Sequence, residues 1–246
     1  MKVNQVVKAD CRDVAKQLVG KVDLVYADIL YDAPRAVPYE ELCLSLKPGG
    51  ALFIQTDQRS VTCVKGILDR RSHATGKPYY DVTFVNWIIW SYNWGGRAKD
   101  KFAAKHDDIL YYARVGKSRK FNAKDVSIPK TVMINSKKDW QIPTDVWAGN
   151  FYTTSAERIA DPKTKRGFRW QKPEWLLERI ILATTDPGDL VFEPYLGTGT
   201  ACAVAKKLGR RYVGCDIEKQ MVTVATKRLR AVGKEGYEHL LIEPEG

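Results

Sequence analysis

Short apolar runs recur through the first half of the chain, and turn-forming residues separate them. A continuous apolar run of this kind is typical of a strand that is buried on both faces of a sheet. The stretch Tyr39–Leu46 differs, because it runs into Lys47-Pro48-Gly49-Gly50 and predicts a helix closed by a Pro-Gly turn. The runs predict five strands, which are Val3–Val7, Val22–Ala27, Gly50–Gln55, Phe84–Trp90 and Asp107–Ala113.

The last third of the chain predicts a regular alternation of helices and strands. Residues 173–185 begin with a proline and predict a helix, which the turn at residues 186–189 ends. The strand Leu190–Glu193, a glycine-rich loop, a helix over about 200–208, the strand Arg211–Cys215 and a helix over 217–231 follow. Between Ser118 and Arg169 the periodicity fades, so we expect a variable insertion or recognition region there.

Composition narrows the class of protein. The 246 residues are 44% apolar and 28% charged, which favours one globular domain over residues 1–246. No apolar run approaches the roughly 18–20 residues of a membrane span, and the N-terminus lacks the apolar stretch of a signal peptide. We therefore expect a cytoplasmic, intracellular protein. Five cysteines and three histidines are scattered without a Cys-x-x-Cys pair, which indicates neither disulfides nor a metal site.

The positive charge is concentrated in the middle of the chain. Residues 97–172 hold 18 basic and 8 acidic residues, which is nearly all of the net charge of +11. A solvated lysine-rich face is one interpretation. The same segment also contains aromatic residues, and basic groups among aromatics neutralise phosphates and stack on bases. We therefore favour nucleic acid as the partner, with DNA and RNA both open at this point. These aromatics include Phe102, Phe121, Trp140, Trp147, Phe151, Tyr152, Phe168 and Trp170.

The loop Gly197-Thr198-Gly199 lies between a predicted strand and a predicted helix, and Asp216 ends the next strand. Main-chain N–H groups of such a loop approach an anionic or zwitterionic ligand, and the carboxylate accepts hydrogen bonds from ribose hydroxyls. A tight turn with a structural aspartate is the alternative. NAD fits poorly, because only 30 residues follow Asp216 and the other strands must come from the N-terminal half. The sheet order is then permuted in sequence.

These segments resemble a known family, the permuted (β-class) amino-methyltransferases of DNA. The resemblance rests on QKPEWLLERIILATTDPGDLVFEPYLGTGTACAVAKKLGRRYVGCDIEKQ, VDLVYADILY, LKPGGALFI and NWIIWSYNWGG followed by KHDDILYYAR, and covers roughly residues 1–122 and 171–232. It implies an α/β, Rossmann-like S-adenosylmethionine-dependent methyltransferase fold with a mostly parallel, permuted sheet. Residues 97–170 would be an inserted basic region that contacts double-stranded DNA. The family also implies a bacterial or phage source and a possible homodimer.

The resemblance also implies a set of cofactor-binding residues. Asp216 would hold the ribose of S-adenosylmethionine, Asp10 and the backbone of Cys11 would meet its adenine, and Lys172 would border its methionine end. The full set is Asp10, Cys11, Asp28, Lys172, Glu193, Tyr195, Gly197, Thr198, Gly199, Thr200 and Asp216.

The segment Asp28-Ile29-Leu30-Tyr31 occupies the family's catalytic position, where Asp-Pro-Pro-Tyr or Ser-Pro-Pro-Tyr is usual. Asp28 and the carbonyl of Ile29 would accept the two N–H groups of the target amine, and Tyr31 would stack on the flipped base. Two lost prolines cost roughly 1–2 kcal/mol of rigidity and add two N–H groups that need partners. An ordinary strand-end aspartate and a core tyrosine are the alternative. Glu193 and Tyr195 replace the family's Asp and Phe, which are milder departures.

Three functions follow from these features. The first is methylation of adenine N6 in duplex DNA, which aspartate at position 28 favours over cytosine N4. The second is a degenerate methyltransferase that binds DNA without turnover, which the missing prolines suggest. The third is methylation of RNA, which would use the same basic segment and the same cofactor.

Overall fold

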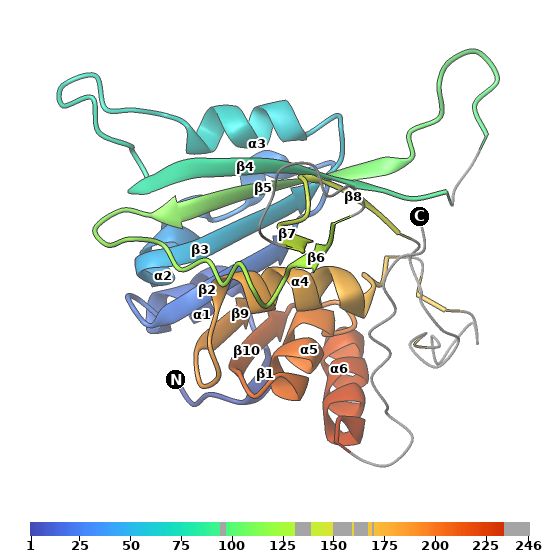
Figure 1. Cartoon of the computed structure of the whole chain (residues 1–246). Helices are drawn as coiled ribbons and strands as arrows, with labels where there is room; N and C mark the ends of the chain where they lie inside the picture. The colour runs from blue at the N-terminus through green and yellow to red at the C-terminus, as the bar shows by residue number, and fades with distance from the viewer. Residues whose placement is uncertain (94–96, 131–138, 150–158, 160–166, 169, 234–246) are drawn as a thin grey trace.

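The computed structural model describes residues 1–93, 97–130, 139–149, 159, 167–168 and 170–233. Within them, one sheet holds eight strands in the order β1-β10-β9-β2-β3-β5-β4-β8, and β6 and β7 form a separate pair. Every strand of the large sheet runs in the same direction except β5, which is antiparallel to both of its neighbours. The predicted mostly parallel α/β sheet is therefore present (Figure 1).

The N-terminal elements confirm the five predicted strands to within a few residues at each end. Two helices, α1 and α3, were not predicted; α1 buries only Val14 and Ala15, so its apolar stripe is too short to stand out. The elements are β1 (Gln5–Lys8), α1 (Cys11–Gln17), β2 (Val22–Asp28), the 3₁₀ helix η1 (Pro34–Ala36), α2 (Tyr39–Ser45), β3 (Leu46–Thr56), α3 (Val61–Leu68), β4 (Val82–Ser91) and β5 (His106–Arg114).

The predicted Pro-Gly turn after α2 lies inside β3. Leu46 pairs with Val22 and Ala51 pairs with Leu24. Between these two pairs β3 moves forward by five residues while β2 moves forward by two, so β3 contains three extra residues. Gly49 has a φ of 82°, a conformation that glycine adopts without the steric cost of a Cβ. The sequence therefore marked a real irregularity, which the sheet accommodates as a bulge in place of a break.

From α4 onward the C-terminal elements match the predicted alternation closely, whereas the three short strands before α4 were not predicted. They are β6 (Ile128–Pro129), β7 (Trp140–Gln141), β8 (Val146–Ala148), α4 (Glu174–Thr184), β9 (Leu190–Glu193), α5 (Thr200–Lys207), β10 (Arg211–Asp216) and α6 (Lys219–Ala231). The predicted recognition region, residues 97–170, falls partly outside the described residues, and Phe151 and Tyr152 lie there. Its strand β8 pairs with β4, so part of this region belongs to the main sheet.

The permutation predicted from the sequence is visible in the strand order. The N-terminal strand β1 pairs with β10, and β9 pairs with β2, so the C-terminal unit is inserted between the first two strands of the chain. The carboxyl ends of β1, β10, β9 and β2 consequently lie along one edge of the sheet. Asp216, Glu193 and Asp28 end three of these strands, and Asp10 follows the fourth.

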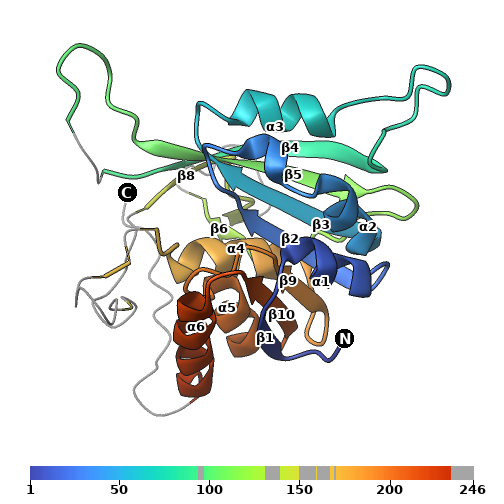
Figure 2. The ribbon, with the colours of Figure 1, turned by 180° about the vertical axis from the view of Figure 1, so that it is seen from behind.

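Helices cover both faces of the sheet. Val25 and Ala27 of β2 pack toward α1, α2 and α3, whereas Leu24 and Tyr26 pack toward α4, α5 and α6. Figures 1 and 2, which view the molecule from opposite sides, show these two helical layers. Because neighbouring residues of the central strands are all buried, their apolar runs are continuous, which is the pattern from which they were predicted.

Candidate active site

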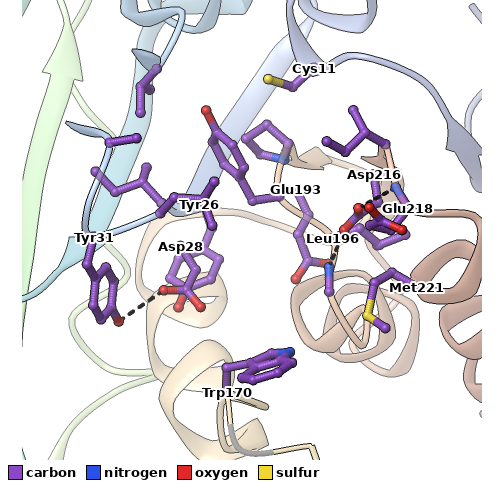
Figure 3. A pocket seen from close by; sticks show the side chains of 18 of the residues that line it. Cys11, Tyr26, Asp28, Tyr31, Trp170, Glu193, Leu196, Asp216, Glu218 and Met221 are labelled. Atoms are coloured by element: carbon purple, nitrogen blue, oxygen red, sulfur yellow. Dashed lines mark hydrogen bonds between the residues drawn. The ribbon is translucent and has the colours of Figure 1, made fainter. Parts of the chain in front are cut away.

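A cavity of about 1170 Å³ opens at the carboxyl edge of the sheet. Figure 3 shows Asp28 and Tyr31 on one side of it, Asp216, Glu218 and Met221 on the other, and Glu193 between them. The fold thus brings together nearly all the predicted site residues from distant parts of the chain. Those that line the cavity are Asp10, Cys11, Asp28, Ile29, Tyr31, Lys172, Glu193, Tyr195, Gly197, Thr198, Thr200 and Asp216.

Gly199 is the predicted site residue that does not line the cavity. It precedes α5 with a φ of 73°, and a Cβ built on it would lie 2.8 Å from the Cβ of Ala225 in α6. Glycine is needed here for two reasons, the left-handed backbone and the close approach of α6. Gly197 also has a positive φ, of 49°. The two glycines shape the loop, and Gly197 alone faces the cavity.

Two carboxylates at the rim are held by main-chain N–H groups. Asp216 accepts from the N–H of Gly197 at 3.0 Å and from that of Glu218 at 2.9 Å. Asp10 accepts from the N–H of Arg12 at 2.7 Å and caps α1. Such bonds orient the carboxylates and leave further lone pairs for a ligand. The exposed side chain of Ile217 lies beside them, and an apolar surface next to oriented carboxylates suits a nucleoside.

Glu193 lies at the centre of the cavity and at the start of α5. Its two carboxylate oxygens accept from the N–H groups of Ala201 at 3.2 Å and Cys202 at 2.9 Å. Burial raises the pKa of Glu193 to about 7, although these hydrogen bonds act in the opposite direction. The Glu193 carboxyl group therefore accepts hydrogen bonds from main-chain N–H groups at the N-terminus of α5 and also forms part of the cavity wall.

Arg228 of α6 was missed by the sequence analysis. Its buried guanidinium donates to the Thr200 hydroxyl at 2.8 Å and to Glu174 of α4 at 2.7 Å. Through these bonds it joins three helices around the glycine-rich loop. A single arginine on an otherwise amphipathic helix carries no sequence signal that separates it from the surface arginines nearby.

Asp28 forms the opposite end of the cavity. Lys172 Nζ lies 2.5 Å from Asp28 Oδ2, and the Tyr31 hydroxyl lies 3.3 Å from Asp28 Oδ1. Burial raises the pKa of Asp28 and the Lys172 ammonium opposes that rise. Lys172 is only 7% exposed, so the ion pair is largely removed from water. Its place just before α4 follows from the Gln-Lys-Pro segment, since Pro173 caps that helix.

The two residues that replace prolines point in opposite directions. Ile29 is buried in the core beside α1 and α2, and its N–H donates to the carbonyl of Gln55 at 3.1 Å. Leu30 is 65% exposed and lies at the mouth of the cavity. The N–H and the side chain of Ile29 therefore both have partners within the fold, and Ile29 also lines the cavity.

Several cavity residues were not predicted from the sequence. Asp107 and Tyr92 line it from β5 and from the end of β4, and Trp170 lines it with 60% of its surface exposed. A signal existed for Asp107, because a charged residue that opens an apolar strand needs a buried partner. Trp170 lies two residues before Lys172 and beneath Asp28 in Figure 3.

Comparison with known proteins identifies the family. The family model described as DNA methylase (N6/N4) matches residues 26–227, which is most of the chain. The chain belongs to the N6/N4 DNA methylase family. Within curated relatives, it is 30% identical over 193 residues to the type II methyltransferase M.HpaI of Haemophilus parainfluenzae. It is 35% identical over 158 residues to the type II methyltransferase M.HinfI of Haemophilus influenzae.

Each match covers a larger share of this chain than of the relative. The M.HpaI match takes in 77% of this chain but 56% of the relative, and the M.HinfI match takes in 62% and 41%. The chain thus spans about half the length of the curated relatives it matches. A shorter segment of 87 residues is 48% identical to M2.DpnII of Streptococcus pneumoniae.

Solved structures confirm the predicted fold. A structure described as an M1.HpyAVI–SAM complex superposes with a TM-score of 0.64 at 21% identity, over 92% of this chain and 99% of that one. The PvuII DNA methyltransferase, described as cytosine-N4-specific, gives a TM-score of 0.71 at 13% identity, over 91% and 85%.

Other predictions concerned metals, disulfides and membranes. Within the described residues, no three His, Cys, Asp or Glu side chains gather in a way that could hold a metal ion. All five cysteines, which are described, carry free thiols. The described helices include none that is long and apolar enough to cross a membrane.

Proposed function

We propose that this chain is an S-adenosylmethionine-dependent DNA methyltransferase whose target is the exocyclic N6 of a flipped adenine. One observation carries the proposal. A single cavity joins Asp28 and Tyr31, from the segment that resembles the family's catalytic motif, to the glycine loop and Asp216, which suit a nucleoside. Membership of the N6/N4 DNA methylase family supports the same reaction.

The residues present fit the proposed cofactor. Asp216 and Asp10 offer oriented carboxylates for ribose hydroxyls and for an adenine amine, and Ile217 offers an apolar surface to a purine. Lys172 and Thr200, whose hydroxyl lies 3.3 Å from the Lys172 carbonyl, line the same cavity, and we assign them to the methionine end. When bound, S-adenosylmethionine supplies a methyl group that is already activated for transfer.

Asp28 has one oxygen available for a target amine. Its Oδ2 is bound to Lys172, whereas Oδ1 has only the Tyr31 hydroxyl, at 3.3 Å. We assign Oδ1 as the acceptor of one N–H of the target, with the Ile29 carbonyl as the second acceptor. Holding both protons turns the nitrogen lone pair toward the methyl group, and the positioned carboxylate stabilises the charge that develops on nitrogen. The Lys172 ammonium helps to keep Asp28 ionised.

The duplex is proposed to lie across the edge of the sheet where the cavity opens. Tyr92 lines the cavity immediately after β4, so residues 97–105, between β4 and β5, leave the sheet beside it. This segment contains four basic residues, one acidic residue and Phe102, whose side chain is fully exposed. Lysine and arginine bind phosphates, and an exposed aromatic ring stacks on an unpaired base.

The test is to incubate the purified protein with S-adenosylmethionine and unmethylated duplex DNA, and to analyse the nucleosides by mass spectrometry. N6-methyladenine is expected. N4-methylcytosine would keep the reaction and overturn the choice of base, and parallel incubation with RNA tests the third function. Asp28→Ala should abolish the product, whereas Asp13→Asn, on the exposed side of α1, should not. Binding of cofactor and DNA without any product would favour a degenerate methyltransferase.

A further inference from the structure

A buried carboxylate, Asp107, lies behind the catalytic segment. It is 5% exposed and it accepts three hydrogen bonds. Its Oδ2 accepts from the Tyr31 hydroxyl at 2.9 Å and from Gln55 Nε2 at 2.8 Å, and its Oδ1 accepts from the Tyr92 hydroxyl at 3.0 Å. Three donors from three different segments thus converge on one side chain, which is how a buried charge is usually accommodated.

Gln55 connects this carboxylate to the main chain of the same segment. Its side chain is fully buried, donates to Asp107, and accepts from the Tyr26 hydroxyl through Oε1. Its main-chain carbonyl accepts from the N–H of Ile29 at 3.1 Å. The pairing of β2 with β3, which ends at Asp28 and Gln55, is therefore extended by one main-chain hydrogen bond from Ile29. Ile29 is the first of the two positions where the family has prolines.

The Ile29 hydrogen bond exists only because position 29 is not a proline, which has no N–H to donate. On the other side, the Ser60 hydroxyl donates to the carbonyl of Tyr31. The segment Asp28–Tyr31 is thus fixed at both ends by polar contacts with β3, β5 and the start of α3. These contacts supply the rigidity that two prolines would otherwise supply.

The Tyr31 hydroxyl has one hydrogen to donate and two carboxylates within reach. Asp107 Oδ2 is at 2.9 Å and Asp28 Oδ1 is at 3.3 Å, so the shorter hydrogen bond goes to Asp107. While Asp107 takes this hydrogen, Asp28 Oδ1 stays open to another donor. Without Asp107, the phenol would turn to Asp28 and occupy the oxygen assigned to the target amine.

We propose that Asp107, with Gln55, is a positioning residue that replaces the two prolines, holding the Tyr31 phenol so that Asp28 Oδ1 is left free for the target amine. The proposal rests on the proposed function. Asp107 lines the cavity, but the three hydrogen bonds that it accepts come from Tyr31, Tyr92 and Gln55, so we assign it a role that acts through Tyr31.

The first test is a double-mutant cycle on kcat and on the KM for cofactor. Asp107→Asn removes the charge and one of the two oxygens that accept from three donors, so the Tyr31 phenol should turn to Asp28 and kcat should fall by on the order of tenfold. Tyr31→Phe removes that phenol, so the loss from Asp107→Asn should not add to the loss that Tyr31→Phe itself causes. The double variant should be no slower than the slower single variant. The KM for cofactor should stay within about twofold, since Asp216 and Asp10 are untouched. Multiplication of the two kcat losses would overturn the proposal.

Two tyrosine variants serve as controls for the cycle. Tyr92→Phe removes the hydrogen bond to the other oxygen of Asp107, so an effect exerted through Asp107 should likewise not multiply with that of Tyr31→Phe. Tyr112 lies on β5, the strand that carries Asp107, and its hydroxyl donates to Asp69 at 2.8 Å. Neither Tyr112 nor Asp69 lines the cavity. Tyr112→Phe therefore removes a comparable tyrosine–carboxylate bond and should leave kcat unchanged.

The pH profile adds a readout that a purely structural role would not move. The titratable groups around Asp28 are Lys172, Tyr31, Tyr26 and Asp107, and the negative charge of Asp107 raises the pKa of Asp28. Asp107→Asn removes that charge, so the acidic limb of kcat should move to lower pH. If the acidic limb of the kcat profile lies at the same pH in Asp107→Asn as in the wild type, the proposal is contradicted. Asp69→Asn, at the distant tyrosine, should not move it.

A readout independent of turnover separates this proposal from the proposed function. In protein labelled with ¹³C at the tyrosine ζ carbon, Asp107→Asn should shift the Tyr31 and Tyr92 signals and leave that of Tyr112 in place. Unshifted signals would overturn the arrangement itself. If Asp107→Asn shifts these signals but the wild-type protein transfers no methyl group, the hydrogen-bond arrangement is upheld. The proposed function, and the positioning role of Asp107 in it, would then be overturned.

Discussion

The two ends of the cavity are built by different kinds of contact. At the glycine-loop end, Asp216, Asp10 and Glu193 are oriented by main-chain N–H groups that lie 2 to 19 residues away in sequence. At the Asp28 end, side chains bind side chains across 144 residues for Lys172–Asp28 and 76 residues for Tyr31–Asp107. A site made of local main-chain geometry tolerates sequence change around it, whereas a site made of long-range pairs depends on each partner.

The largest effect is expected from Asp28→Asn at the catalytic end. The amide loses the negative charge and one acceptor, so kcat should fall by roughly 10²–10⁴-fold, the range of a positioned acid–base or charge-stabilising group. Cofactor affinity, measured by calorimetry, should change only a few-fold because the glycine-loop end is intact. An equal loss of affinity and kcat would show that the two ends are not separable.

Loss of the ion-pair partner should affect stability as well as rate. Lys172→Met leaves the Asp28 carboxylate partly buried without its cation, and breaking a buried pair costs about 3–5 kcal/mol of unfolding free energy. The same change raises the pKa of Asp28 further, so the acidic limb of activity should move to higher pH. Urea unfolding measures the first effect, with the exposed Lys21→Met as the matched control. A change below 1 kcal/mol would mean that water already solvates the pair.

Glu193 gives a pH-dependent stability at the glycine-loop end. Its pKa rises from 4.5 to about 7 on folding, so the folded state binds the extra proton between these values. Its contribution, up to about 3 kcal/mol, is fully present below pH 4.5 and is lost as pH rises through 7. Glu193→Gln should flatten this slope in urea unfolding at pH 5 and pH 8. Glu218→Gln, an exposed residue, should leave the slope as in the wild type.

The smallest effect is expected from Asp216→Asn. The amide keeps one acceptor oxygen but loses the charge that strengthens hydrogen bonds to ribose hydroxyls, so cofactor affinity should fall by about tenfold. The value of kcat at saturating cofactor should stay close to that of the wild type. A large fall in kcat with unchanged affinity would reverse the roles given to the two ends.

Much of the fold was predictable because its determinants are local. Continuous apolar runs marked the strands, proline and glycine marked the turns, and Asp216 after a glycine loop marked the nucleoside-like end. Helices α1 and α3 were missed because they are short, and α1 buries only Val14 and Ala15. At the site, Asp107, Gln55 and Arg228 were missed, because their roles depend on partners 15 to 76 residues away.

The sequence by itself determined the order of the main strands and C-terminal helices, the permutation, the family resemblance and the residue types available for chemistry. The tertiary structure decided how those residues are used. It placed Ile29 in the core, gave its N–H to Gln55, paired Lys172 with Asp28 and directed the Tyr31 phenol to Asp107. The physical reason is that main-chain conformation is set by neighbours along the chain, whereas a buried polar group is satisfied only by whatever the packed fold brings to it.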